Sequence, residues 1–237
     1  MNLSRRTLLA FGTATAAGVL AAPAHASPPP AASPPAASPP AASPPAASPS
    51  SRDAWSRLVA GNARFAAGRP VHPRQDPTYR RGLVGGQEPF ACVLGCADSR
   101  VPPELLFDQD LGDLFAVRAV GEVLDDAVVG SVEYAVEHLG VRAVVVLGHS
   151  GCGAVRAAIE LVHGTSEVTG SVSTVARAIE ATVRATPPRP DFLAACVRNQ
   201  ASGVAEELPR RSSMIHEARV EIIPAVYDLD SGLVRRH

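Results

Sequence analysis

The chain has 237 residues, and its 22 basic and 23 acidic side chains give a formal net charge of −1. Every basic residue is an arginine, which excludes chemistry that needs a lysine amine, such as Schiff-base formation or the phosphate-binding lysine of a P-loop. The balanced charge and an aromatic content of 4% argue against nucleic-acid binding, which needs a concentrated positive surface and stacking side chains.

Residues 1–26 have the features of a twin-arginine export signal. Arg5 and Arg6 precede a weakly apolar run over 8–22, and the Ala-His-Ala tripeptide at 24–26 offers a small-x-small cleavage site. A membrane anchor is the alternative, but the apolar run is short, rich in Ala, Gly and Thr, and ends at a proline. We therefore expect a protein that is secreted or held in the cell envelope or periplasm, with no stable membrane span after signal removal.

Residues 27–51 repeat the motif SPPAA, which cannot bury apolar surface and favours the polyproline II conformation. At ~3.1 Å per residue, a segment of roughly 25 residues reaches ~75 Å. We expect a disordered linker that holds the following domain away from a cell wall or membrane surface. Its serines leave O-glycosylation open.

Residues 52–237 fit a single domain. Apolar residues at helical spacing predict an opening helix over 53–67, and continuous apolar runs predict strands that are buried on both faces. In chain order, the expected strands are 90–94, 114–120, 143–147 and 220–227, and the later helices are 130–139, 154–162, 172–185 and 192–208. Because strands and helices alternate, the sequence predicts an α/β fold with a mostly parallel sheet flanked by helices. Ligands of such sheets gather at the carboxyl ends of the strands.

Two of these strands run directly into candidate metal ligands. The first strand leads to Cys96 and Asp98, and the buried strand 143–147 leads to His149 and Cys152. Thiolate, imidazole and carboxylate together suit the tetrahedral coordination of Zn²⁺. The sequence therefore predicts a zinc site at the carboxyl edge of the sheet.

A disulfide between Cys96 and Cys152 is the alternative, because an exported protein meets an oxidising compartment. A twin-arginine signal carries folded proteins, so metal can bind first in the cytoplasm, where thiols stay reduced. Cys92 and Cys196 have no ligand partners in the sequence and are predicted to be buried small hydrophobic residues. The histidines without a companion group are interpreted as surface or capping residues: His72, His138, His163, His216 and His237.

The segments CADSRVPPE and HSGCGAV, with Cys96 and His149 53 residues apart, resemble the C-x-D-x-R and H-x-x-C motifs of the β-class carbonic anhydrases. The resemblance extends through AGNARF, DLGDLFAVRAVGEVLDDAVVGSVEYAVEHLGV and VYDLDSGLV, which cover essentially the whole domain. It implies a zinc lyase that reversibly hydrates CO₂ to bicarbonate and a proton by a zinc-bound hydroxide. By this resemblance, Cys96, His149 and Cys152 are the zinc ligands.

The resemblance also makes Asp98 and Arg100 a switching pair. If Asp98 binds zinc, the tetrahedron is closed; if Arg100 holds Asp98 in a bidentate ion pair, the fourth position is open for water. Because two thiolates make the metal less positive than three histidines would, we expect an alkaline activity optimum. A plain surface ion pair is the alternative for this spacing.

The family pattern further implies that Gln87, Phe115, Val120 and Tyr134 bind substrate, Gln87 through its amide and the others as an apolar pocket and its rim. Ordinary packing or capping is the alternative for each of them. Val93 stands where one family subset has a tryptophan that helps to form an inhibitory bicarbonate site. We therefore expect no bicarbonate switch.

Two residues depart from the family pattern. Glu122 stands where an amide is common, which could alter loop hydrogen bonding or proton exit, and Ala97 replaces a serine at little expected consequence. The family's pocket lies between two subunits, so the resemblance implies a homodimer at least, or a tetramer. The expected exposed apolar face of Trp55, Leu58 and Phe65 on the opening helix agrees with this.

Two other functions remain open. A non-catalytic zinc-stabilised domain would keep Asp98 permanently in the fourth position of the metal. An exported thiol-disulfide protein would cycle Cys96 and Cys152 between thiols and a disulfide, although the chain has no C-x-x-C pair.

Overall fold

The computed structural model describes residues 50–71 and 74–237. The expected export signal (1–26) lies outside these residues, and so does the expected linker (27–51) except for Ser50 and Ser51. Ser51 already begins the first helix, and the Ser50 side chain caps it by accepting a hydrogen bond from the Asp53 amide. Within the described ranges no helix is long and apolar enough to cross a membrane.

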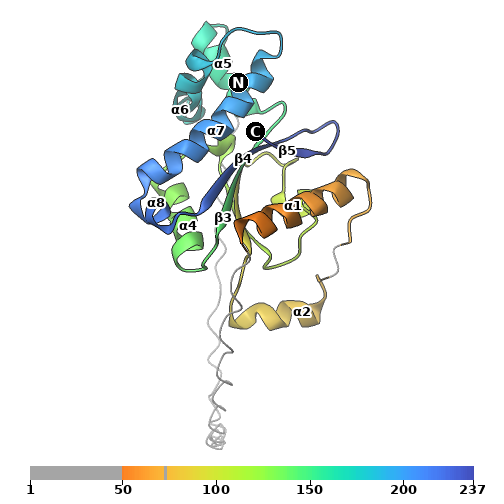
Figure 1. The fold of residues 1–237 in the computed structure, drawn as a ribbon. Coiled ribbons are helices and arrows are strands. Elements are labelled where there is room, and N and C mark those ends of the chain that lie inside the picture. The colour runs from red at the N-terminus through yellow and green to blue at the C-terminus, as the bar shows by residue number, and fades with distance from the viewer. Residues whose placement is uncertain (1–49, 72–73) are drawn as a thin grey trace, which may run out of the picture. The chain divides into compact units, whose positions relative to one another are not determined.

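Five strands form one sheet in the order β2-β1-β3-β4-β5 (Figure 1). They are β1 (Ala91–Gly95), β2 (Leu114–Arg118), β3 (Ala143–His149), β4 (Glu221–Tyr227) and β5 (Val234–Arg236). The first four are parallel to one another, and β5 pairs antiparallel with β4. All residues of β1 and β3 are buried, as their continuous apolar sequences predict. The predicted α/β fold with a mostly parallel sheet is confirmed.

All five predicted helices are present: α1 (Ser51–Ala66), α4 (Asp126–Glu137), α5 (Gly153–His163), α6 (Val172–Ala185) and α7 (Phe192–Arg211). The α4 helix begins four residues earlier than predicted because the Asp125 side chain accepts a hydrogen bond from the Val128 amide. The elements that the sequence did not predict are α2 (Pro77–Gly82), α3 (Pro103–Leu106), α8 (Ser213–Ala218), β5 and the 3₁₀ turns η1 (Leu83–Gly85) and η2 (Val120–Glu122). They are too short to show a hydrophobic period.

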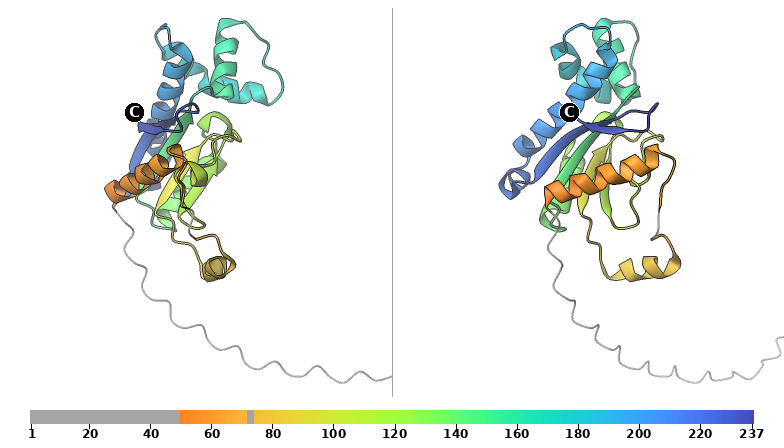
Figure 2. Two further views of the ribbon diagram at one scale, coloured as in Figure 1. Left: turned by 90° about the vertical axis from the view of Figure 1, so that its right-hand side faces the viewer. Right: turned by 45° about the vertical axis from the view of Figure 1, so that its right-hand side comes forward.

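Alternate residues of the central strands face two different helical layers. Val93 and Val145 pack with Leu58 of α1 on one face of the sheet. Leu94 and Val146 pack on the other face, with buried residues of α4 and α7. The α5 and α6 helices pack on each other beyond the carboxyl ends of the strands (Figures 1 and 2). The carboxyl edge of the sheet is thereby covered by a helical pair.

The prediction that the opening helix has an exposed apolar face is wrong. Leu58 is fully buried in the core, and Trp55 and Phe65 are partly buried against it, because α1 covers the sheet of its own chain. Gly61 allows this close packing, since a Cβ atom there would lie 1.7 Å from the Phe107 carbonyl oxygen. Asn62 fixes the helix further through hydrogen bonds to three backbone groups, those of Leu106, Gly232 and Val234.

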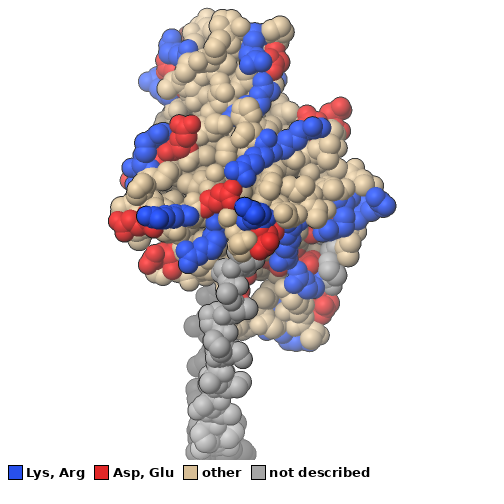
Figure 3. Space-filling view, in the orientation of Figure 1, with Lys and Arg blue, Asp and Glu red and all other residues tan. Residues whose placement is uncertain are grey.

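Charged side chains of both signs are interspersed on the face of the molecule shown in Figure 3. The histidines expected at the surface, His138, His163, His216 and His237, are exposed, while His72 lies outside the described residues. Cys92 and Cys196 are completely buried free thiols, which confirms their prediction as small hydrophobic residues.

Candidate metal centre

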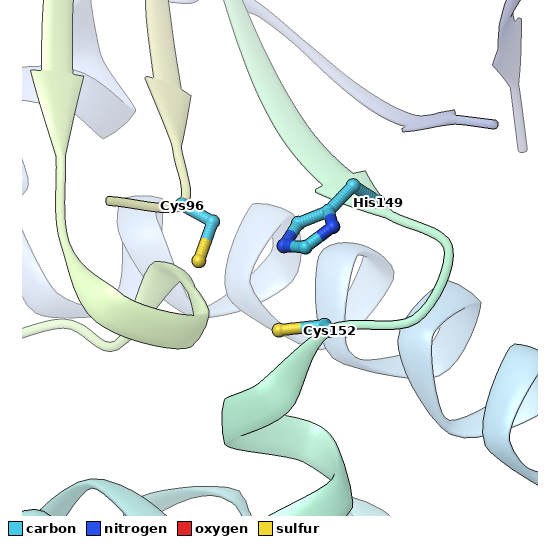
Figure 4. A group of neighbouring side chains, drawn as sticks. All are labelled: Cys96, His149 and Cys152. Atoms are coloured by element: carbon cyan, nitrogen blue, oxygen red, sulfur yellow. The ribbon is translucent and has the colours of Figure 1, made fainter. Parts of the chain in front are cut away.

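Three donor side chains meet where β1 and β3 end. Cys96 directly follows β1, His149 is the last residue of β3, and Cys152 caps the N-terminus of α5. Because β1 and β3 are adjacent and parallel, their carboxyl ends lie together. The Sγ and ring nitrogen atoms of the three residues all lie within 4.8 Å of one another, and all three residues are buried (Figure 4). The structure thus brings together the three residues that the sequence singled out.

The imidazole of His149 is oriented by its own turn. Its Nδ1 lies 3.0 Å from the carbonyl oxygen of Ser150, so Nδ1–H donates there and the lone pair of Nε2 points towards the cysteines. Nε2 is buried and has no hydrogen-bond partner among the described residues. A buried nitrogen of this kind is costly unless a ligand occupies it.

Ser150 is a residue of the site that the sequence did not reveal. Its amide donates to the Tyr227 carbonyl at 2.8 Å, and its hydroxyl oxygen accepts from the Leu229 amide at 2.9 Å. These bonds fasten the turn after His149 to the end of β4. A serine directly before a glycine-cysteine pair carries no sequence signal of such a role, because its partners are distant in the chain.

Cys96 and Cys152 shift each other's pKa in opposite directions. Their mutual hydrogen bond lowers the pKa of Cys96, and the side chain of His149 and the Gly121 amide, 3.3 Å from Cys96 Sγ, lower it further. The same bond to Cys96 raises the pKa of Cys152. By contrast, burial alone raises the pKa of Cys92 to about 12. Two cysteine sulfurs and one imidazole nitrogen within 4.8 Å of one another are donors that Zn²⁺ accepts, so this cluster fits a zinc ion.

Asp98 lies beside the cluster and is held by Arg100. The guanidinium donates from Nε to Oδ1 at 2.9 Å and from Nη2 to Oδ2 at 2.7 Å, and the Arg100 amide donates to Oδ1 at 3.0 Å. This bidentate contact holds the pKa of Asp98 well below its usual range. Oδ2 is nevertheless only 3.9 Å from His149 Nε2. The carboxylate therefore lies within a short movement of the metal-binding atoms.

A cavity of about 300 Å³ opens beside Cys96 and Asp98. Its wall is almost entirely apolar and comes from η2, α5 and α6, with the side chains of Val120, Ala154, Ala157, Val172, Val175 and Ala176. The sequence indicated Val120 but none of the α5 and α6 residues, because their contribution depends on how the two helices pack.

Comparison with known proteins identifies the family. A family model described as carbonic anhydrase matches residues 91–234. "Carbonic anhydrase 2" of Mycobacterium tuberculosis is 44% identical over 186 residues, which cover 76% of this chain and 89% of that protein. The chain belongs to the β-carbonic anhydrase family. The carbonic anhydrase of Mycolicibacterium smegmatis is 57% identical over 106 residues, which cover 45% of this chain and 52% of that protein.

Solved β-carbonic anhydrases share the fold. The Coccomyxa enzyme, determined in complex with acetazolamide, is 25% identical, with a TM-score of 0.60 over 77% of this chain and 85% of that chain. A tetrameric β-carbonic anhydrase of Sordaria macrospora is 22% identical, with a TM-score of 0.61 over 78% of this chain and 96% of that chain.

Three of the four other residues that the β-carbonic anhydrase pattern points to lie apart from the cavity: Gln87, Phe115 and Tyr134. Phe115 and Tyr134 pair with each other, with ring centroids 5.9 Å apart, and Phe115 lines a separate hollow beside β2. Gln87 is exposed on the segment between η1 and β1. Within a single chain, Val120 is the member of this group that lines the cavity next to the cysteines.

Glu122, one of the two departures from the β-carbonic anhydrase pattern, is buried and close enough to Cys96 for their charges to interact. It ends the η2 turn with a φ of 53°, it is 1% exposed, and its Oε1 has no hydrogen-bond partner among the described residues. Burial, reinforced by the charge of Cys96, raises its pKa well above the usual value. Burial therefore favours the neutral form of the Glu122 carboxyl group relative to a glutamate in water.

Proposed function

We propose that the chain catalyses the reversible hydration of CO₂ to bicarbonate and a proton, with Zn²⁺ held by Cys96, His149 and Cys152. The observation that carries this proposal is the buried donor cluster, in which Nε2 of His149 has no hydrogen-bond partner among the described residues. Two thiolates and an imidazole leave one tetrahedral position free, which is the arrangement of a catalytic zinc site. The contact between Asp98 and Arg100 keeps the nearest carboxylate out of that position.

Each residue of the site has a distinct part in this reaction. A bound Zn²⁺ supplies a Lewis acid that lets water lose a proton near neutral pH. Ser150 keeps the His149 ring in the tautomer that presents Nε2 to the cluster. Asp98, held by Arg100, can accept a hydrogen bond from the reacting water and orient its lone pair towards the substrate. Because Cys96 and Cys152 donate negative charge, the activity is expected to rise towards alkaline pH.

The apolar cavity suits the substrate. CO₂ has no net dipole and only weak acceptor atoms, so it gains little from polar walls. The cavity offers the side chains of Val120, Val172 and Val175 next to Asp98, so substrate carbon can approach the reacting water without competition from a charged wall. The product bicarbonate is charged and polar, which favours its release from the same wall.

A second copy of the chain would complete the pocket. Gln87 is exposed, Tyr134 is 46% exposed, and neither lines the cavity of its own chain, which supports their contribution to a neighbouring subunit. Phe115 packs against Tyr134, so a contact that places Tyr134 at a neighbouring subunit's pocket would place Phe115 there as well. The proposed unit is a homodimer or a tetramer. Sedimentation velocity distinguishes these, and a monomeric, fully active enzyme would contradict the shared pocket.

The absence of a bicarbonate switch is part of the same proposal. Val93, a residue of β1, is completely buried in the core cluster that also contains Leu58 of α1, so this position offers no indole group to a bicarbonate site. Added bicarbonate is therefore expected to act only as the reaction product. Sigmoidal inhibition by bicarbonate would contradict this reading.

Export by the twin-arginine route is proposed from residues 1–26, with 27–51 as a linker and 52–237 as the catalytic domain. The sequence around Arg5 and Arg6 supports it. Replacing both arginines by lysine is expected to retain the full-length precursor inside the cell. Undiminished export of that variant would contradict the route.

The test of the proposed function measures activity and metal in the same samples. Stopped-flow CO₂ hydration at pH 7 and pH 8.5 and zinc content are determined for the wild type, for Cys152→Ser and for a control, Cys92→Ala, which removes a buried thiol outside the cluster. We expect one zinc per chain and activity in the wild type and control, and neither in Cys152→Ser. Zinc without activity at either pH would mean an inert zinc-stabilised domain. A metal-free protein that cycles between two reactive thiols and none would mean a thiol-disulfide protein.

A further inference from the structure

Residues at and just after the end of β2 donate hydrogen bonds to the turn that carries Cys96 and Asp98. Arg118, the last residue of β2, donates from Nε to the Cys96 carbonyl oxygen at 3.0 Å and from Nη2 to the Asp98 carbonyl oxygen at 2.5 Å. These contacts join residues 22 and 20 positions apart in the chain. The proposed reaction does not itself use the Arg118 side chain.

The neighbouring backbone groups add to the same contact. The Ala119 amide donates to the Gly95 carbonyl at 3.0 Å, and the Gly121 amide donates to Cys96 Sγ at 3.3 Å. The Asp98 carbonyl also accepts the Val101 amide at 3.0 Å, which closes the turn on itself. Among these donors from 118–121, Arg118 acts through its side chain, so it can be replaced without altering the others.

Fastening two carbonyl groups of one turn fixes the side chains between and beside them. The planar guanidinium has its N–H donors in a rigid fork, so it holds the Cys96 and Asp98 peptide units in one relative orientation. That orientation directs Cys96 Sγ into the cluster and the Asp98 carboxylate towards Arg100. Because Asp98 Oδ2 is only 3.9 Å from His149 Nε2, a small rotation of the Asp98 peptide would take the carboxylate from Arg100 to the metal.

We propose that Arg118 is a positioning residue that holds the 96–98 turn in the arrangement in which Asp98 faces Arg100 and the fourth metal position stays free. The inference rests on the proposed function, since it gives Arg118 its effect through Asp98. It assigns the choice between the open and closed site to two carbonyl contacts made by β2, in addition to the direct ion pair with Arg100.

The test compares Arg118→Gln and Arg118→Lys with a matched control, Arg211→Gln. Arg211 also binds a backbone carbonyl, that of Leu124 at 2.7 Å, but on a loop outside the cluster and its cavity. Arg118→Gln is expected to keep one zinc per chain and to lose about tenfold or more in kcat/KM at pH 7, as for other residues that orient metal ligands. The loss is expected to be smaller at pH 8.5, where hydroxide competes better with Asp98 for the metal. Arg118→Lys, which retains a cationic donor, is expected to recover part of the activity, and Arg211→Gln to match the wild type.

Two further measurements separate positioning from a general loss of structure. With Co²⁺ in place of zinc, the visible absorption spectrum of Arg118→Gln at pH 7 is expected to differ from that of the wild type, because Asp98 replaces water. Hydrogen exchange of the Val101 amide, followed in the proteins as purified, is expected to be faster in Arg118→Gln, since Val101 shares the Asp98 carbonyl with Arg118.

Each outcome decides a different point. If Arg118→Gln keeps the wild-type ratio of activities at the two pH values, the wild-type cobalt spectrum and the wild-type exchange of Val101, the inference about Arg118 is wrong while the proposed function stands. If the wild type holds no metal and hydrates no CO₂, the proposed function fails. The exchange of Val101 would still show whether Arg118 fixes the turn.

Discussion

Replacing Glu122 by glutamine isolates the cost of keeping a carboxyl group buried behind the metal ligands. Glutamine has nearly the shape of the neutral acid but cannot ionise. Glu122 has a folded pKa well above its usual value, so its contribution to stability is fully present below the unfolded pKa of about 4.3 and is lost as the pH rises through the folded pKa. The wild type is therefore expected to lose stability relative to Glu122→Gln as the pH increases.

The expected slope comes from proton linkage. Between about pH 4.3 and the folded pKa, the unfolded state releases a proton that the folded state keeps, so the difference in unfolding free energy grows by about 1.4 kcal/mol per pH unit. The wild type therefore loses stability relative to Glu122→Gln at up to this rate until the pH reaches the folded pKa of Glu122. Urea unfolding at several pH values, with a chelator and a reductant present so that metal and thiol oxidation do not contribute, measures it. The matched control is the exposed Glu206, replaced by glutamine.

The outcome that refutes this expectation is a difference between wild type and Glu122→Gln that does not change with pH. Glu122 would then ionise at the same pH in the folded and unfolded states, which burial at 1% exposure and an Oε1 without a partner among the described residues do not allow. A difference that reverses sign would mean a folded carboxylate stabilised by a positive group.

Three other substitutions test separate parts of the site and the fold. Arg100→Gln removes the group that holds Asp98, so Asp98 is free to enter the fourth metal position. CO₂ hydration at pH 7 is expected to fall by about tenfold or more with unchanged zinc content. Wild-type activity would contradict the switching role of this pair. Asn62→Ala removes the hydrogen bonds to three backbone groups, two of them buried and one, the Gly232 carbonyl, partly buried. It is expected to lower the unfolding free energy by about 3 kcal/mol in urea titration, and a loss below about 1 kcal/mol would contradict that role. Gly121→Ala places a Cβ atom 2.7 Å from the Ile179 side chain, at a backbone φ of 68°. It is expected to lower the unfolding free energy by about 2–4 kcal/mol and to weaken zinc retention. An unshifted melting temperature would contradict this packing.

The central strands and the ligand cluster could be predicted from the sequence because their signals are local. The continuous apolar runs of β1 and β3 predict strands buried on both faces, and a parallel sheet brings the residues that come directly after those strands to one edge. The meeting of Cys96, His149 and Cys152 could therefore be predicted without information about side-chain packing.

The features that the sequence could not predict depend on contacts between distant segments. The spacing of Trp55, Leu58 and Phe65 shows that one face of α1 is apolar, but not whether its own sheet or another subunit covers it. The same holds for the cavity wall, since Val172 and Val175 reach the cysteines only because α6 packs on α5. The short β5 strand owes its place to pairing with β4 and to the Asn62 side chain rather than to its own three residues.

The central claim is that two cysteines and one histidine hold a divalent metal while Arg100 keeps Asp98 aside. A crystal structure of the purified protein at pH 8.5 tests it most directly. We expect one zinc ion bound by Cys96 Sγ, His149 Nε2 and Cys152 Sγ, with water in the fourth position and Asp98 still paired with Arg100. A metal-free site, or a zinc ion with the Asp98 carboxylate as its fourth ligand at that pH, would contradict it.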